Sequence, residues 1–329
     1  MTDEIIVSVL CTAYNHEKYI RHCLDGFVMQ KTNFRYEVLI NDDASTDNTA
    51  AIIREYEEKY PEIIKPIYQT ENQFSKKVRI AREVLFPRAG GKYIALCEGD
   101  DYWIDPLKLQ KQVDALERHP ECHMSVCRVS RVSEDEQTEV GVCPAFPLEE
   151  GVIPSERFLN KVFREYAFHT SSYVMASSAF KRLCTDPPAF VSACPVGDEA
   201  SMLYFGAAGD VYYCSDTMSC NRRGSIGGWN SRTWSNPEHR RNYFLGMART
   251  YECFDEYTCG KYHDQCRDRI FHENYFLAET SEDFRKLLHD EPEVFRRQSR
   301  RTKIRVFVGA YCHSLLKLYY KLTKQVVNN

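Results

Sequence analysis

"CEGDDYW", residues 97–103, directly follows the apolar run YIAL at residues 93–96. The run is short and comes after two glycines, so it predicts a buried strand. Glu98, Asp100 and Asp101 therefore lie at the end of a buried strand, where carboxylates are costly unless a cation meets them. Carboxylate oxygens suit Mg²⁺ or Mn²⁺, ions that commonly bridge to phosphates. Taken alone, the stretch predicts either a metal–diphosphate site or a solvated turn before a helix capped by Asp105.

Strand and helix patterns alternate around this stretch, from the N-terminus to about residue 118. Such alternation is typical of a doubly wound α/β fold, in which helices cover both faces of a mostly parallel sheet. Beyond it the pattern is less regular, and from residue 237 it is helical, which predicts a helical C-terminal appendage. The predicted strands of the first part are residues 5–11, 36–40, 64–68 and 93–97, and its predicted helices are residues 20–28, 48–60, 76–86 and 107–117.

Polar clusters follow three of these strands, at residues 12–15, 41–43 and 98–101. Ligands of a parallel α/β sheet bind at the carboxyl ends of its strands. We therefore expect the three clusters to form one site. No Gly-x-Gly-x-x-Gly motif occurs, which disfavours a dinucleotide oxidoreductase.

Charge is distributed unevenly along the 329 residues. The net charge is −4, so no global basic field indicates a nucleic-acid partner. Residues 294–329, however, contain no Asp or Glu and nine Lys or Arg, so the rest of the chain carries −13 (−4 less +9). The nine cations are Arg296, Arg297, Arg300, Arg301, Lys303, Arg305, Lys317, Lys321 and Lys324.

The fourteen cysteines are dispersed, and no signal peptide is recognised at the N-terminus. This favours free thiols in a reducing, cytoplasmic environment. The cluster Cys253, Cys259, His263 and Cys266 has irregular spacing and is a weak metal candidate. No apolar run reaches 18 residues, so no transmembrane helix is expected.

Three motifs together resemble the inverting family 2 glycosyltransferases of the GT-A fold, bacterial capsule and O-antigen types above all. They are "TAYNHEKYI" from residue 12, "INDDASTDNT" from residue 40 and "CEGDDYWIDPLKLQKQ" from residue 97. The resemblance is strong over residues 1–125 and weaker to about residue 235. It implies a catalytic domain over residues 1–235, with a nucleotide-sugar half (1–125) and an acceptor half (126–235), and a helical region over residues 236–329.

The resemblance implies that Ala13, Tyr14 and Asn15 lie around the nucleotide base. Asp42 and Asp43 match the family's acidic pair after the second strand. A carboxylate there can accept the imide N–H of uracil, which favours a UDP-sugar donor. The alternative for both residues is a helix cap.

Glu98-Gly99-Asp100 occupies the position of the family's Asp-x-Asp motif, with glutamate as the first acid. The resemblance implies that Asp100 binds a divalent metal, Mn²⁺ or Mg²⁺, which offsets the charge of the departing diphosphate. Asp101 is a second metal ligand or an acceptor beside it. Glu98 would contact the ribose or a metal-bound water.

Two later positions complete the implied machinery. Asp198 fits the family's general base at the start of a helix, and Glu199 stands where relatives often carry an aromatic residue, so either acid is a candidate base. Their alternative is favourable charge at a helix N-terminus. Arg222 opens a Gly-rich loop and would clamp the diphosphate, unless the loop is ordinary surface.

The basic C-terminal segment also carries an apolar stripe at helical spacing, from Ile304 to Leu322. A basic amphipathic helix is typical of peripheral membrane binding, here at the inner face of the cell membrane. The alternatives are packing on the catalytic domain or in a homodimer interface.

The sequence thus predicts an inverting glycosyltransferase that acts on a saccharide or lipid-linked saccharide. The alternatives are a catalytically impaired scaffold of the same fold and, less favoured because no glycine-rich signature follows the first strand, a sugar-phosphate nucleotidyltransferase.

Overall fold

The computed structural model describes residues 4–164, 168–225, 234, 236–281, 284–290 and 292–312. The chain divides into two compact units. Unit 1 comprises residues 1–187 and 198–228, and unit 2 comprises residues 188–197 and 229–329. The segment 188–197 therefore belongs with the C-terminal helices although it lies within the first two thirds of the sequence.

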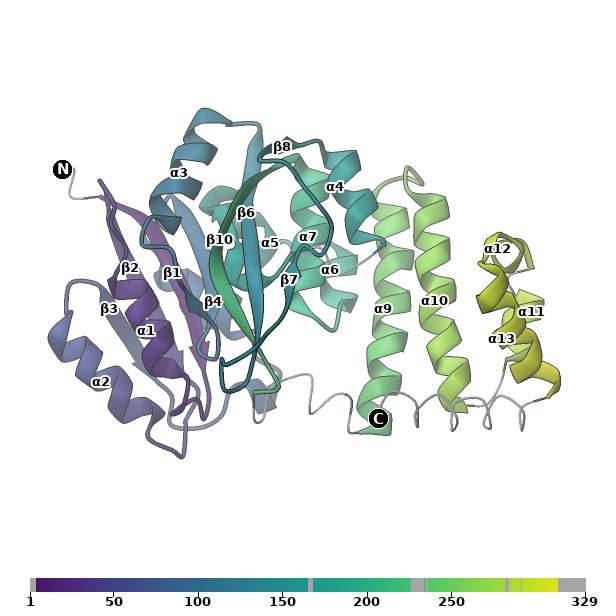
Figure 1. Cartoon of the computed structure of the whole chain (residues 1–329), viewed down its shortest axis with the longest axis horizontal. Coiled ribbons are helices and arrows are strands. Elements are labelled where there is room, and N and C mark those ends of the chain that lie inside the picture. The colour runs from purple at the N-terminus through teal and green to yellow at the C-terminus, as the bar shows by residue number, and fades with distance from the viewer. Residues whose placement is uncertain are drawn as a thin grey trace. The chain divides into compact units, whose positions relative to one another are not determined.

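Ten strands of the described residues form one sheet in unit 1 (Figure 1). Its order is β3-β2-β1-β4-β9-β6-β10-β5, with β7 paired to β6 and β8 paired to β10. The strands are β1 (Ile5–Ala13), β2 (Arg35–Asp42), β3 (Ile64–Tyr68), β4 (Tyr93–Glu98), β5 (Tyr102–Trp103), β6 (Cys122–Ser133), β7 (Glu139–Cys143), β8 (Gly151–Ile153), β9 (Val174–Ala176) and β10 (Asp210–Arg223).

The first four strands are parallel, with β1 between β2 and β4. In this register Ala13 lies opposite Asp42, and Thr12 lies opposite both Asn41 and Glu98. The three polar clusters predicted at strand ends therefore meet at one edge of the sheet, because this pairing aligns the carboxyl ends of β1, β2 and β4.

Helices cover both faces of this sheet, which confirms the predicted doubly wound α/β fold. On one face α1, α2 and α3 share a hydrophobic core with β1, β2 and β4. On β4, neighbouring Ile94 and Ala95 point to opposite faces and both are fully buried. The helices of unit 1 are α1 (Ile20–Val28), α2 (Thr49–Lys59), α3 (Lys108–Arg118), α4 (Ser155–Val162), α5 (Ser177–Thr185) and α7 (Gly197–Ala208), of which Gly197 lies in unit 2.

The prediction of one helix over residues 76–86 is wrong. The segment contains a 3₁₀ turn, η1 (Phe74–Lys76), then a π turn, η2 (Ala81–Leu85), and a second 3₁₀ turn, η3 (Phe86–Arg88). Lys77 has φ of 66°, which ends the first turn, and Pro87 lacks the N–H that a continuing helix needs.

The predicted starts of two other helices are close to those observed. Asp47 Oδ1 accepts a 2.9 Å hydrogen bond from the backbone N–H of Thr49, and Asp105 Oδ1 accepts one of 2.8 Å from that of Leu107. Each carboxylate satisfies an N–H that the first turn of the helix leaves without a partner.

Unit 2 is helical, which confirms the predicted C-terminal helical region. α9 packs against α6 and α10. A second cluster joins residues of α10 to α11, α12 and α13 through Phe284, Leu287, Val294 and Val306. No described helix is long and apolar enough to cross a bilayer. The helices are α6 (Ala189–Ala193), α9 (Pro237–Tyr257), α10 (His263–Ser281), α11 (Arg285–Asp290), α12 (Pro292–Arg297) and α13 (Arg300–Tyr311).

Gly26→Ala is expected to destabilise the protein, although alanine favours a helix by about 1 kcal/mol. An added Cβ would lie 2.8 Å from the carbonyl oxygen and 2.9 Å from the amide nitrogen of Trp103, and backbone atoms of β5 cannot swing away. We expect the free energy of unfolding to fall by about 1–3 kcal/mol in a urea titration. Gly197→Ala is the matched control, because its Cβ would meet nothing within 4 Å. Equal losses in the two variants would contradict this account.

Candidate functional site

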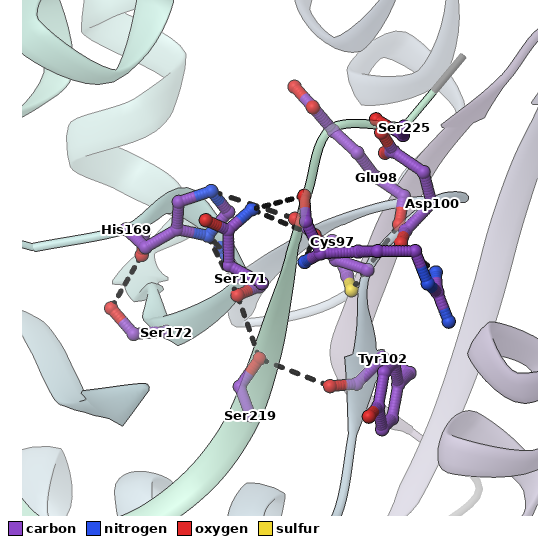
Figure 2. A network of polar contacts seen from close by, with 12 residues as sticks. Cys97, Glu98, Asp100, Tyr102, His169, Ser171, Ser172, Ser219 and Ser225 are labelled. Carbon is purple, nitrogen blue, oxygen red and sulfur yellow. Dashed lines mark hydrogen bonds and ion pairs between the residues drawn. The ribbon is translucent and has the colours of Figure 1, made fainter. Parts of the chain in front are cut away.

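Three carboxylates gather at the end of β4. Glu98, Asp100 and Asp101 each offer an oxygen within 4.8 Å of the others (Figure 2). The turn is fixed by a 2.9 Å hydrogen bond from the N–H of Gly99 to the carbonyl of Thr12. Glycine is needed here, because a Cβ would lie 2.9 Å from the ring of His16.

Asp101 is held in place by the protein. Its Oδ1 accepts hydrogen bonds from Asn221 Nδ2 and from the backbone N–H of Arg222, both 3.0 Å long. Its Oδ2 lies 3.6 Å from Nε2 of His169, a ring whose pKa burial lowers to about 3 and which is therefore neutral. Burial and the charges of Asp100 and Glu98 raise the pKa of Asp101, and its two donors oppose that rise. Asp101 is thus oriented by β10.

Asp100 and Glu98 complete the cluster. Asp100 Oδ2 accepts a 2.8 Å hydrogen bond from Ser225 Oγ, and Figure 2 shows Glu98, Asp100 and Ser225 grouped together. The Glu98 side chain is exposed, and loss of solvation together with the charges of Asp100 and Asp198 raises the pKa of its carboxyl to about 8. The charge of Asp100 raises the pKa of both Glu98 and Asp101, and one ion could contact all three groups, so the cluster fits a hard divalent cation.

Asp198 lies close enough to this cluster for its charge to act on Glu98, although 100 residues separate them in sequence. It lies in the first turn of α7 and is partly exposed, while Glu199 is buried at 7% exposure. Asp198 Oδ1 accepts a 2.8 Å hydrogen bond from the N–H of Glu199. Of the two acids, Asp198 is the one that solvent reaches more freely.

The acidic pair after β2 is divided between two roles. Both oxygens of Asp43 accept backbone N–H groups, from Gln73 at 2.8 Å and Phe74 at 3.0 Å, so Asp43 fixes the loop beyond β3. Asp42 accepts a long 3.4 Å bond from Ser45 N–H through Oδ2, but its buried Oδ1 has no partner among the described residues. Burial raises the pKa of Asp42. A buried carboxylate oxygen without a donor is unfavourable, so this position fits a ligand N–H.

The predicted base pocket after β1 contains an exposed ring and a packed backbone. Tyr14 is 37% exposed, whereas Ala13 is 2% exposed and accepts the N–H of Asp43. Asn15 adopts φ of 55° and its Oδ1 accepts the N–H of Thr46 at 2.8 Å. Asn15 thus ties the β1 end to the loop after β2.

Arg222, the predicted diphosphate clamp, has its guanidinium in contact with other residues of the protein. Its side chain is fully buried, and its guanidinium pairs with Glu136 and donates to the carbonyl of Asp100. The group lies 4.6 Å from the ring centroid of Tyr19 and 5.1 Å from that of Tyr102. No role could be predicted from the sequence for Glu136 or Asn221. Their partners, Arg222 and Asp101, lie 86 and 120 residues away along the chain. The glycines of the predicted loop at 227–228 lie outside the described residues.

A buried network supports the strand that follows the acids. Trp103, at 2% exposure, donates its indole N–H to the carbonyl of Ser171 at 3.0 Å. Ser219 Oγ donates to Ser171 Oγ at 2.7 Å, as Figure 2 shows. Lys108 is fully buried, lies 4.3 Å from the Trp103 ring and donates to Gln112 at 2.7 Å. Trp103 is therefore a core residue.

Two curated bacterial proteins resemble this chain. Over 129 residues it is 48% identical to the uncharacterized protein Rv1520 of Mycobacterium tuberculosis, covering 39% of this chain and 36% of Rv1520. It is 33% identical over 130 residues to the putative teichuronic acid biosynthesis glycosyltransferase TuaG of Bacillus subtilis, covering 40% of this chain and 49% of TuaG. The match spans half or less of each relative.

Two solved structures share the fold. TarS 1-349 of S. aureus in complex with UDP-GlcNAc gives a TM-score of 0.56 at 15% identity, covering 93% of this chain and 87% of that one. The mannosyltransferase PcManGT of Pyrobaculum calidifontis, in complex with GDP-Man and Mn²⁺, gives 0.54 at 17% identity, covering 98% and 84%. At these identities the likeness shows the fold, which is the predicted GT-A fold.

The sequence also matches the family described as Glycosyl transferase family 2 over residues 8–178, just over half of the chain. The matched segment contains the whole β1–β2–β4 edge with its acidic cluster and ends after β9. The chain therefore belongs to glycosyl transferase family 2.

Proposed function

We propose that this protein transfers a sugar, with inversion, from a nucleotide-sugar to a hydroxyl of a saccharide or lipid-linked saccharide. The observation that carries the proposal is the cluster of Glu98, Asp100 and Asp101 at the end of β4, with Asp198 close enough to influence it. Family membership supports the same chemistry.

The donor is proposed to be a UDP-sugar. The unpartnered Oδ1 of Asp42 can accept the imide N–H of uracil, and the exposed Tyr14 ring can lie against the base. Among the relatives, WfgD of Escherichia coli is named a UDP-Glc-dependent glucosyltransferase. Guanine and thymine also present an N–H donor, and PcManGT was solved with GDP-Man, so GDP and dTDP are the competitors to exclude.

The metal is proposed to be Mn²⁺ or Mg²⁺ held by Asp100, with Asp101 and Glu98 beside it. The carboxylate oxygens of these residues are the ligands that Mn²⁺ and Mg²⁺ prefer. The bound ion would offset the negative charge of the departing diphosphate. Asp101 would keep the loop in the geometry that Asn221 and Arg222 impose.

Asp198 is proposed to be the general base. Its carboxylate would take the proton of the acceptor hydroxyl while the hydroxyl oxygen bonds to the anomeric carbon. The bond between that carbon and the diphosphate oxygen breaks on the opposite side, and its electron pair leaves with the nucleoside diphosphate. Glu199 is the less favoured base because it is buried.

The acceptor class rests on the relatives' names alone. WfgD is named for a diphosphoundecaprenol-linked acceptor, and TuaG for teichuronic acid biosynthesis. We therefore propose a role in bacterial polysaccharide biosynthesis, with a hexosyl or N-acetylhexosaminyl group transferred.

The donor and metal assignments predict that UDP with Mn²⁺ stabilises the protein more than GDP, CDP or dTDP. At 100 times its dissociation constant a ligand stabilises by about 2.7 kcal/mol, which raises the unfolding midpoint by several degrees. Asp100→Asn should abolish the Mn²⁺-dependent part of the shift, whereas Asp114→Asn, an exposed change on α3, should leave it intact. Selective stabilisation by GDP would overturn the donor, and no shift with any nucleotide would overturn the proposed function.

The base assignment predicts that Asp198→Asn lowers kcat by about 10²–10⁴-fold while the UDP–Mn²⁺ thermal shift stays unchanged. Glu199→Gln is the matched comparison, because it removes the neighbouring charge. Turnover is followed by release of UDP, and the anomeric configuration of the product by NMR. Loss of turnover in Glu199→Gln alone would move the base to Glu199, and retention of configuration would contradict direct displacement.

A further inference from the structure

The C-terminal helix α13 has two apolar faces. Val306, Gly309 and Ala310 are buried, and a Cβ at Gly309 would lie 2.5 Å from the ring of Phe284. A second stripe points outward, where Ile304, Phe307 and Tyr311 are 55%, 59% and 57% exposed.

This outward stripe is a continuous surface of large side chains. Its residues follow the i, i+3, i+7 spacing of one helix face, and the rings of Phe307 and Tyr311 lie 4.8 Å apart. The sequence left open whether this stripe packs inside the protein. Of its described residues, Ile304, Phe307 and Tyr311 are not core residues, because each of these large apolar side chains is more than half exposed.

Cations surround the stripe. Arg300 precedes Ile304 by four residues and therefore lies on the same face. Viewed down the helix axis, with about 100° of turn per residue, Arg301 lies about 60° from Ile304 on one side. Lys303 lies about 100° from Ile304 on the other side. Residues 294–329 carry nine cations and no acid, against −13 on the remainder. An anionic surface would therefore attract this segment and repel the rest of the chain.

We propose that α13 docks the protein on an anionic phospholipid surface, with Ile304, Phe307 and Tyr311 inserted among the acyl chains and Arg300, Arg301 and Lys303 at the headgroups. A second copy of the chain is a less suitable partner for this face, because two α13 helices packed through their outward faces would bring their cations close together. Cations near anionic lipid and buried apolar side chains both strengthen such binding.

Co-sedimentation of the full chain with vesicles tests the proposal. We expect binding to vesicles of mixed phosphatidylglycerol and phosphatidylcholine, weaker binding to phosphatidylcholine alone, and a marked loss between about 0.1 M and about 0.5 M salt. Phe307→Glu should lower the partition coefficient about tenfold or more, because it removes an inserted ring and adds a repelled charge. Leu245→Glu, the same charge change at an exposed apolar site of α9, is the control.

Absence of a phosphatidylglycerol effect, or equal losses in the two variants, would overturn the proposal. So would a dimer in sedimentation velocity that Phe307→Glu dissociates while vesicle binding is absent, since the stripe would then be a self-association surface. The readout is lipid binding and does not depend on the proposed transfer activity.

A separate observation concerns the turn between β6 and β7, residues 133–137. Glu136 has φ of 61°, a conformation that non-glycine residues rarely adopt. Its carboxylate pairs with Arg222 and lies 3.0 Å from Nδ1 of His22. Two residues earlier, Glu134 accepts the hydroxyl of Tyr19 at 2.6 Å. The turn is thereby tied to both α1 and β10.

Arg222 carries this contact into the acidic cluster. The guanidinium of Arg222, which pairs with Glu136, donates to the carbonyl of Asp100. The backbone N–H of Arg222 donates to the carboxylate of Asp101. A buried guanidinium requires an anionic partner, so without Glu136 the arginine would have to move toward solvent. Both hydrogen bonds to the metal loop would then shift.

We infer that Glu136 is a positioning residue that fixes the metal loop through Arg222; the inference rests on the proposed function. Glu136→Gln should raise the Mn²⁺ concentration needed for half of the UDP thermal shift by about tenfold, the size expected when an outer-shell partner of a metal site is lost. Glu134→Gln makes the same charge change in the same turn and should have no such effect. Glu136→Asp, which keeps the charge, should fall between.

Circular dichroism without ligand checks that each variant is folded. If Glu136→Gln does not fold, the comparison of Glu136→Asp with Glu134→Gln decides. If the wild-type protein shows no Mn²⁺-dependent shift, the proposed function fails. If the wild-type protein shows a Mn²⁺-dependent shift, and Glu136→Gln and Glu134→Gln alter that shift equally, only the inference about Glu136 fails.

Discussion

Mutual repulsion among three carboxylates is the constraint on which the rest of the site depends. Two carboxylate charges no more than 4.8 Å apart repel by at least about 3 kcal/mol at an effective dielectric constant of about 20. The loop after β4 would relax outward if nothing opposed this. Donors from β10 hold Asp101, Ser225 holds Asp100, and the absence of a Cβ at Gly99 lets the turn lie against α1. The protein thus holds three carboxyl groups together where a bound dication would remove the repulsion and favour their ionised forms.

Much of the fold could be predicted from the sequence, because its first half is built from local patterns. The strand at 93–98 follows from a short apolar run, and the meeting of three strand ends follows from parallel pairing. The exception is the segment at 76–86, where Lys77 and Pro87 break a helix-like pattern of apolar residues. The residue roles at the site stay predictions until they are tested.

The role of a site residue was harder to predict from the sequence where its side chain has two plausible partners. Asp42 and Asp43 are adjacent and chemically identical, yet one is saturated by backbone N–H groups and the other keeps a vacant oxygen. The sequence around Arg222 is typical of a phosphate-binding loop, but Arg222 lies in β10 and a glutamate 86 residues earlier binds it in the interior. Such choices depend on tertiary contacts between distant segments, which local sequence patterns do not encode.

The register of β1 has a consequence for how the chain can change in evolution. Two neighbours are aligned to this one strand, so Ala13 meets Asp42 and Thr12 meets Glu98 at the same time. An insertion of a single residue within β1 would displace both alignments and turn its buried valines to the opposite face. The turn at 133–137 joins two antiparallel strands whose pairing does not depend on its length, but Glu136 within it pairs with Arg222. Descendants of this chain can therefore vary the turn only where Glu136 still reaches Arg222, while the length of β1 stays fixed.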